Sequence, residues 1–156
     1  MAKYDLESFV RDIETMLKAN LNAQITAINA EKGDFSLLTV ADTAYIFQTL
    51  DDKVVSYSPC VFYYVDTIVS EGVGPATSES ISIEIVVILS DTKDGKTQYR
   101  LLRYLRVLKD LFNIKWNAIH SSKKIKVESL VPIQFALQNS SKFVHAIGVK
   151  LTVDII

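Results

Sequence analysis

The chain has few residues that form cross-links or interrupt regular structure, and it has no apolar run long enough to span a membrane. Its 156 residues include only 1 cysteine, 5 glycines and 3 prolines. The single cysteine excludes an internal disulfide, and the few glycines and prolines exclude a low-complexity linker. The longest apolar run, residues 85–89, is far shorter than the roughly 20 residues that span a bilayer. The opening MAKYDLESF lacks the basic and apolar regions of a signal peptide. We therefore expect a soluble intracellular protein with no membrane contact.

Patterns that carry chemistry are also missing from the sequence. Neither histidine, His120 nor His145, has another ligand residue at metal-binding spacing. No Gly-x-Ser-x-Gly elbow is present, and Gly72-Val73-Gly74 lacks the third glycine and the following helix of a dinucleotide loop. We therefore expect no catalytic residue, no metal and no cofactor, and a protein that is not an enzyme.

Three weaker candidates have simpler interpretations. Cys60 lies in an apolar stretch, where cysteine behaves as a small hydrophobe more often than as a catalytic thiol. The pair Asp51-Asp52 is typical of a solvated turn. Asp91 and Asp94 flank a turn and could bind a cation, but two carboxylates alone are a weak signal.

The bulk composition indicates one globular domain. Hydrophobic residues make up 49% and charged residues 22% of the chain, which excludes a disordered protein. The length suits a single domain covering residues 1–156. The formal net charge of -1 gives no reason to expect tight sequence-independent binding to nucleic acid.

The first part of the chain predicts one helix and then becomes ambiguous. Apolar residues at helical spacing predict a helix over residues 6–20, with Asp5 as its N-cap and a core-facing stripe. Residues 22–34 could extend this helix or begin a strand. Residues 35–57 hold only short apolar pieces and predict a long, partly extended connection.

The middle of the chain predicts two strands separated by a polar loop. A strand opens at Pro59 and ends near Val69, with β-branched or aromatic residues on both faces. Both of its faces should therefore be covered, and another subunit could cover one of them. The loop covers residues 70–80, and a second strand covers residues 80–89, with its odd-numbered isoleucines on one face.

The last part predicts a helix and two strands. The helix covers residues 98–112, with Thr97 as N-cap and Asn113 ending it in left-handed geometry. Alternation then predicts a strand over residues 123–131 that continues to residue 137, with a bend or an edge position at Pro132. The final strand covers residues 143–155 and should be half exposed on its second face.

This order of elements predicts an α+β fold. Two helices cannot cover both faces of a sheet of four to five strands. We therefore expect a mostly antiparallel sheet with both helices packed on one face and the other face open to a partner.

One charge pattern points to an interaction. Arg100, Arg103, Arg106 and Lys109 recur every three residues on the second predicted helix. They could form a solvated helix face, bind an acidic surface on a neighbouring subunit, or contact DNA phosphates. The last is disfavoured because no reader motif or stacking aromatic accompanies them.

The succession of elements resembles the tail terminators of tailed bacteriophages, also called tail-completion or neck proteins. The resemblance rests on the opening helix FVRDIETMLKANL, the run PCVFYYVD, SISIEIVVIL and YRLLRYLRVLKDLF, and the closing pair KKIKVESLVPIQFAL and KFVHAIGVKLTVDI. Together these stretches cover nearly the whole chain.

The resemblance implies a structural virion protein of the tail or neck. Such proteins form a ring, typically a hexamer, that caps the tail-tube protein and presents a surface to the head–tail connector. DNA passes through the lumen without specific binding. We expect the subunit or partner interface to include Val73 and Pro75 in the polar loop together with the four basic residues of the second helix.

Two other functions stay open at this point. The chain could be another neck or baseplate ring protein. It could also be a small monomeric or dimeric domain that binds a peptide or ligand on its open sheet face. Oligomeric state separates the ring from the binding domain.

Overall fold

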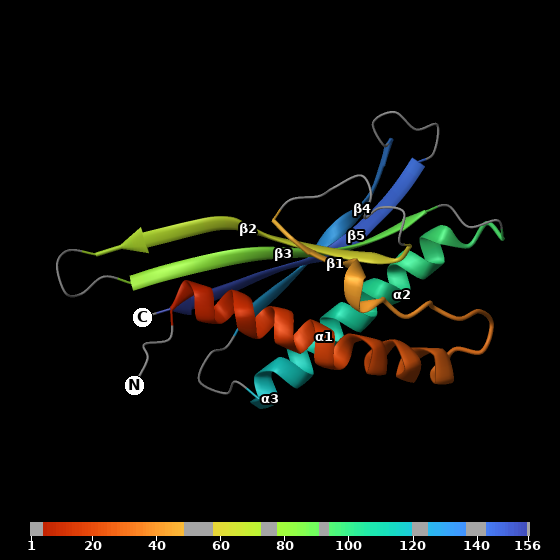
Figure 1. Ribbon diagram of the computed structural model, residues 1–156, viewed down its shortest axis with the longest axis horizontal. Helices are drawn as coiled ribbons and strands as arrows, with labels where there is room; N and C mark the ends of the chain where they lie inside the picture. Colours follow the sequence, from red (N-terminus) through yellow and green to blue (C-terminus); the bar gives the residue numbers. More distant parts are fainter. Residues whose placement is uncertain are drawn as a thin grey trace.

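A computed structural model describes residues 5–48, 58–72, 78–90, 94–119, 125–136 and 143–155 (Figure 1). Its elements follow the chain in the order α1 (Leu6–Glu31), a short 3-10 turn (Asp42–Ala44), β1 (Tyr45–Phe47), β2 (Cys60–Glu71), β3 (Ser78–Ser90), α2 (Thr97–Asp110), a π-helical turn (Leu111–Trp116), α3 (Asn117–Ile119), β4 (Ile125–Ala136) and β5 (Phe143–Ile155).

The strands form one sheet with the order β1-β2-β3-β5-β4. β1 is parallel to β2, and the other neighbours are antiparallel. Both α1 and α2 lie on the same face of this sheet (Figure 1). The predicted α+β fold, a mostly antiparallel sheet with two helices on one face, is confirmed.

Helix α1 is longer than the sequence predicted. Asp5 caps it as expected, because its Oδ1 accepts a 2.9 Å hydrogen bond from the backbone N–H of Ser8. The helix does not end near residue 20 but continues to Glu31, since Leu21, Ile25 and Ile28 prolong the buried stripe. At 26 residues α1 is roughly 39 Å long.

Helix α2 also differs from the prediction at both ends. Lys96, not Thr97, occupies the cap position, and no side chain of the described residues makes a capping hydrogen bond there. Asn113 does not end the helix, because a π-helical turn carries it on to Trp116. The wider turn keeps both Phe112 and Trp116 fully buried, with the Trp116 ring edge-on to Phe9 at 5.6 Å between centroids.

Strands β2 and β3 form a long hairpin that extends beyond the helices (Figure 1). Both strands reach into the predicted loop, since β2 ends at Glu71 and β3 begins at Ser78. The prediction that both faces of β2 are covered holds only at its start, where Cys60 and Val61 are buried. From Asp66 to Glu71 every residue of β2 is exposed. We call residues 66–71 of β2 and 78–80 of β3 the hairpin arm.

Strand β4 lies at one edge of the sheet and is bent. Its register against β5 shifts between Leu130 and Ile133, around Pro132. This confirms the bend and the edge position predicted from the proline. On β5, the second face is buried at Val144 and Ala146 and becomes exposed only toward Asp154, so half exposure applies to the end of the strand.

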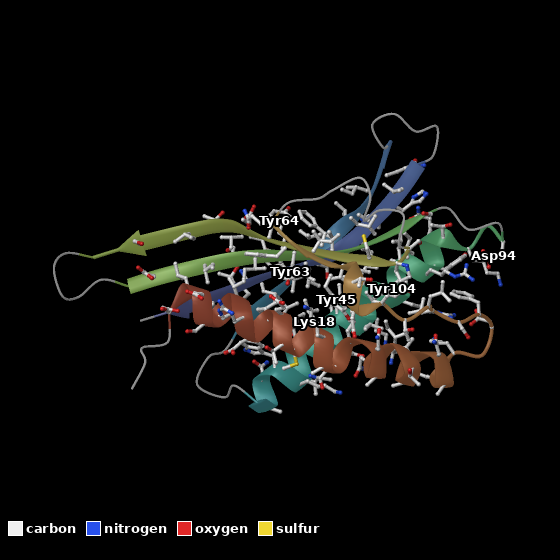
Figure 2. The ribbon with its side chains drawn as sticks, viewed as in Figure 1. Lys18, Tyr45, Tyr63, Tyr64, Asp94 and Tyr104 are labelled. Atoms are coloured by element: carbon white, nitrogen blue, oxygen red, sulfur yellow. The ribbon has the colours of Figure 1, made fainter. Side chains whose placement is uncertain are left out.

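The core lies between the helices and the sheet. Figure 2 shows Tyr63 on the helix side of the sheet and Tyr64 on the opposite side, as strand alternation requires. The fully buried side chains include Phe9, Ile13, Leu17 and Leu21 of α1, Leu101 and Tyr104 of α2, and Ile81, Ile83 and Ile85 of β3. Among the described residues, no helix is long and apolar enough to cross a membrane.

Candidate interaction surfaces

The predicted basic face of α2 binds acidic groups of its own chain. Arg100 forms a 2.8 Å ion pair with Asp94, at the turn before the helix. Arg106 donates two hydrogen bonds, of 3.0 and 2.8 Å, to the carboxylate of Glu31 at the end of α1. The charge of these arginines is therefore matched without a second subunit, although a role in an interface stays a prediction.

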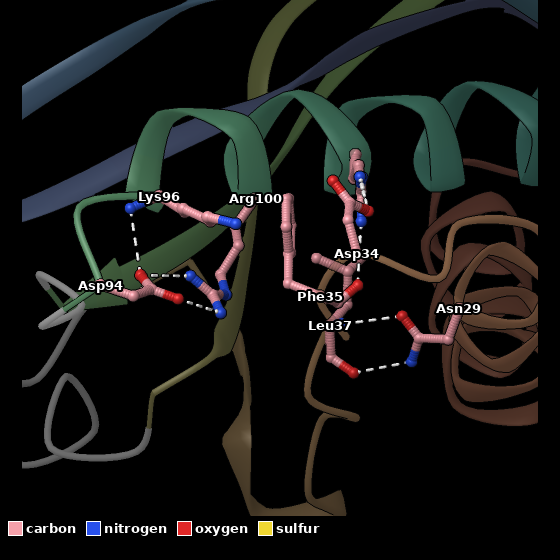
Figure 3. A network of polar contacts seen from close by, with 8 residues as sticks. Asn29, Asp34, Phe35, Leu37, Asp94, Lys96 and Arg100 are labelled. Atoms are coloured by element: carbon pink, nitrogen blue, oxygen red, sulfur yellow. Dashed lines mark hydrogen bonds and ion pairs between the residues drawn. The ribbon is translucent and has the colours of Figure 1, made fainter.

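Arg103 makes the densest set of contacts. Its guanidinium donates a 2.9 Å hydrogen bond to the backbone carbonyl oxygen of Phe35 and also binds the carboxylate of Asp34. The guanidinium carbon lies 3.6 Å from the centroid of the Phe35 ring, which is a cation–π contact. Arg100 and Lys96 approach the same ring, at 4.8 and 5.3 Å from its centroid (Figure 3).

These contacts shift the titration of the groups involved. The hydrogen bond from Arg103 lowers the pKa of Asp34, and the hydrogen bonds from Arg106 lower the pKa of Glu31. The hydrogen bond to Asp94 raises the pKa of Arg100. Each shift stabilises the charged form of the group concerned, Asp34, Glu31 or Arg100.

A connecting segment, to which the sequence pattern assigned no regular structure, is fixed by side chains of both helices. We call residues 34–40 the strap. Asn29 and Asn22 each form two hydrogen bonds with strap backbone, at Leu37 and Val40 respectively. The Tyr104 hydroxyl donates a 2.6 Å hydrogen bond to the carbonyl oxygen of Leu38.

Neither the asparagines nor Tyr104 stood out in the sequence as important residues. The only signal that could have indicated them is spacing. Asn22 and Asn29 lie seven residues apart, on one face of a helix, and the apolar residues Leu37 and Val40 follow in the next segment.

A groove lies between the strap and α2, at the far end of α1. Its volume is about 410 Å³. Its lining combines cations with exposed apolar groups, and consists of Lys32, Asp34, Phe35, Lys96, Tyr99, Leu102, Arg103 and Arg106. We call it the basic groove. Of the four basic residues of the predicted interface, Arg103 and Arg106 line this groove, whereas Arg100 and the exposed Lys109 do not.

A second groove lies near the start of α1, beside the edge of β2. Its volume is about 390 Å³, and it is mostly apolar, with Leu6, Val10, Phe47, Val65, Ile68 and Ile81 among its lining residues. Strand β1 stops here because Gln48 adopts a positive φ of 69°. The Gln48 Oε1 then accepts a 3.2 Å hydrogen bond from the N–H of Val65. The side chain thus bonds the backbone of β2 where the backbone of another β1 residue would otherwise do so.

The face of the sheet away from the helices carries charges and a small hollow. Lys150 forms a 3.1 Å ion pair with Asp66, and this contact raises the lysine pKa. The hollow, of about 230 Å³, is lined by residues that include Tyr64, Val86, Leu130 and Gly148. This hollow has room for a side chain of a partner.

Several predicted site residues lie outside the described residues. These are Val73 and Pro75 of the polar loop, together with His120, Asp51-Asp52 and Asp91. Their predicted roles therefore stay predictions.

The two remaining titratable candidates are buried. Burial raises the pKa of the Cys60 thiol to about 12, so the nucleophilic thiolate is scarce at neutral pH. The Nδ1 atom of His145 lies 3.4 Å from the Nε2 atom of Gln98. Within the described ranges, no three His, Cys, Asp or Glu residues are arranged to hold a metal ion.

Comparison with known proteins adds no identification. No protein-family model matches the chain, and no curated protein matches it significantly.

Proposed function

We propose that this chain is a structural, ring-forming subunit of a tailed-phage particle, of the tail-terminator kind, and not an enzyme. The proposal starts from the resemblance in the order of helices and strands over nearly the whole chain. The α+β fold, with two helices on one face of an antiparallel sheet, is compatible with that resemblance.

The observation that carries the proposal is the exposure of apolar side chains at two different edges of the sheet. On β2, Ile68 is 51% exposed and Val69 lies beside it. On β4, at the opposite edge, Val131 is 80% exposed and Ile133 is also exposed. A closed ring is built from head-to-tail contacts, and such contacts need two different surfaces on each subunit.

In this function the ring would cap the tail-tube protein and meet the head–tail connector, within the virion. DNA would pass through its lumen. The net charge of -1 agrees with passage without specific binding. A related ring of the neck or baseplate would use the same two kinds of surface.

Solution mass is the first test. We expect light scattering over a concentration series to give a mass near six protomers, with ring-shaped particles in electron micrographs. Replacing Val131 and Ile133 by serine should lower that mass without changing the circular dichroism spectrum. A wild-type protein that stays monomeric at every concentration, with or without purified tail tubes, would remove the ring proposal. Rings found at the ends of tail tubes would separate a terminator from a baseplate component.

The second candidate is a binding domain that uses the open sheet face. The hollow beside Tyr64 and Gly148 favours it, but its volume of about 230 Å³ is small. Pockets for small ligands usually have roughly 300–1,000 Å³. This candidate would be supported if the protein stays monomeric and an added peptide protects Tyr64 from chemical modification.

A further inference from the structure

Charge is strongly segregated along the chain. Residues 58–90 contain no lysine, arginine or histidine, and their four carboxylates are those of Asp66, Glu71, Glu79 and Glu84. Residues 93–126 contain ten lysines and arginines against two carboxylates, Asp94 and Asp110. The hairpin of β2 and β3 is therefore acidic, and the segment that follows it is basic.

The fold places the acidic hairpin arm and the start of the basic segment at opposite ends of the molecule. The hairpin arm lies at one end of the longest axis, and the start of α2 lies with the strap at the other end (Figure 1). The arm carries Glu71 and Glu79, together with the exposed apolar side chains of Ile68 and Val69, whereas Asp66 at its base forms an ion pair with Lys150. Because side chains alternate along a strand, the arm presents one acidic and one apolar side chain on each of its two faces.

The basic groove has the complementary character. Exposed Tyr99 and Leu102 supply apolar surface within it. The arginines of the groove are already bound to carboxylates of the chain, whereas its two lysines differ in this respect. Among the described residues, no carboxylate forms an ion pair with Lys32 or Lys96, although Lys96 contacts the Phe35 ring.

We infer that the hairpin arm of one copy of this chain docks in the basic groove of the next copy. The inference rests on the proposed ring and names one of the contacts between its neighbouring copies. Two complementary surfaces at opposite ends of one subunit make a head-to-tail contact, which repeats around a closed ring. Opposite charge on the two surfaces would steer the copies together and fix their register.

A nucleic acid fits the groove less well than a second copy. Asp34 and Glu31 already neutralise Arg103 and Arg106, so a phosphate backbone would meet fewer available cations. The Phe35 ring is covered by cationic side chains and is not open for stacking with a base.

Charge reversal on each surface tests the contact. The arm variant carries Glu71→Lys and Glu79→Lys, and the groove variant carries Lys32→Glu and Lys96→Glu. Each variant alone should assemble about tenfold more weakly or worse, because like charges then face each other. An equal mixture of the two should recover the wild-type mass, since every contact in an alternating ring then pairs opposite charges.

The matched control reverses two positive charges outside the groove, with Lys18→Glu and Lys115→Glu. It should keep the wild-type mass, and all variants should keep the wild-type circular dichroism spectrum. A wild-type ring whose mass is unchanged in the arm and groove variants would overturn this contact and leave the ring itself intact. Weakened variants that do not recover on mixing would also overturn it.

Two further outcomes concern the ring as a whole and a nucleic-acid role for the groove. A wild-type protein that never assembles would remove the proposed ring together with this contact. A groove variant with unchanged mass but weaker binding to a short single-stranded oligonucleotide would overturn the docking of the arm and assign the groove to nucleic acid instead.

Discussion

The side-chain amide of Asn29 forms two hydrogen bonds with the backbone of Leu37. It donates to the carbonyl oxygen at 2.9 Å and accepts from the N–H at 2.7 Å (Figure 3). Asn22 makes the same pair of bonds with Val40, at 2.9 and 2.8 Å. The two amides supply the backbone partners that a neighbouring strand would otherwise provide, and so hold the strap against α1.

We expect Asn29→Ala to lower the free energy of unfolding by about 1–3 kcal/mol. Leu37 is buried, so the substitution would leave its N–H and carbonyl groups without their partner. Urea denaturation followed by tryptophan fluorescence measures the loss. Trp116 is the only tryptophan and is fully buried, so its emission reports unfolding of the core.

The control for this prediction is Asn113→Ala, at an exposed position. It should change the free energy of unfolding by no more than about 0.5 kcal/mol. Asn29→Asp retains an acceptor for the Leu37 N–H but sets a carboxylate oxygen against the Leu37 carbonyl oxygen, so it should also destabilise the protein. Equal losses for Asn29→Ala and Asn113→Ala would show that the amide does not hold the strap.

Arg103→Lys should also destabilise the protein, by about 1–2 kcal/mol, although it keeps the charge. A lysine cannot reproduce the planar guanidinium that stacks on Phe35 while donating to its carbonyl oxygen. Thermal unfolding measures the change. Arg11→Lys is the matched control, because the Arg11 side chain is 74% exposed and that of Arg103 is only 15% exposed. Similar changes in melting temperature for Arg103→Lys and Arg11→Lys would contradict a stabilising role for the stacked guanidinium.

The regular elements were predictable because their signals are local. The helical stripe of α1 and the alternation of β3 and β5 depend on the spacing of neighbouring residues alone. The sequence did not predict where α1 ends, because Asn22, Thr26 and Asn29, which have low helix propensity, interrupt its second half. Burial of Ile25 and Ile28 against the rest of the core decides in favour of a helix.

The strap and the arginine contacts were not predictable, because they depend on partners far apart in the chain. Arg103 and Phe35 are 68 residues apart, and Arg106 and Glu31 are 75 residues apart. The spacing of the arginines showed that they share a helix face. It could not show that the end of α1 and the strap supply their partners.

Acid should weaken the protein through the carboxylates that bind arginine and lysine. The folded-state pKa values of Glu31, Asp34 and Asp66 lie below their ordinary values of 4.5, 3.8 and 3.8. The stabilisation is therefore fully present above those ordinary values and is lost as pH falls through the lowered ones. Urea denaturation at pH 7, 5, 4 and 3 should show stability falling mainly below about pH 5.

The double variant Glu31→Gln, Asp34→Asn tests which groups cause this dependence. It should be less stable than wild type at pH 7 and should lose less stability between pH 5 and pH 3. If the free energy of unfolding of the double variant falls with pH as steeply as that of wild type, other carboxylates cause the acid sensitivity. High salt should reduce the difference between the two proteins, because both ion pairs are partly exposed.

Gly148→Ala should strongly destabilise the sheet. A Cβ atom there would lie 2.0 Å from the carbonyl oxygen of Ile85 and 2.7 Å from Cγ1 of Val86, so β3 and β5 would have to separate. We expect a loss of about 3 kcal/mol or more, or failure to fold, measured by thermal unfolding. Gly33→Ala adds the same methyl group where no atom lies within 4 Å, and should be nearly neutral. A Gly148→Ala protein as stable as Gly33→Ala would mean that the two strands have room between them for a methyl group.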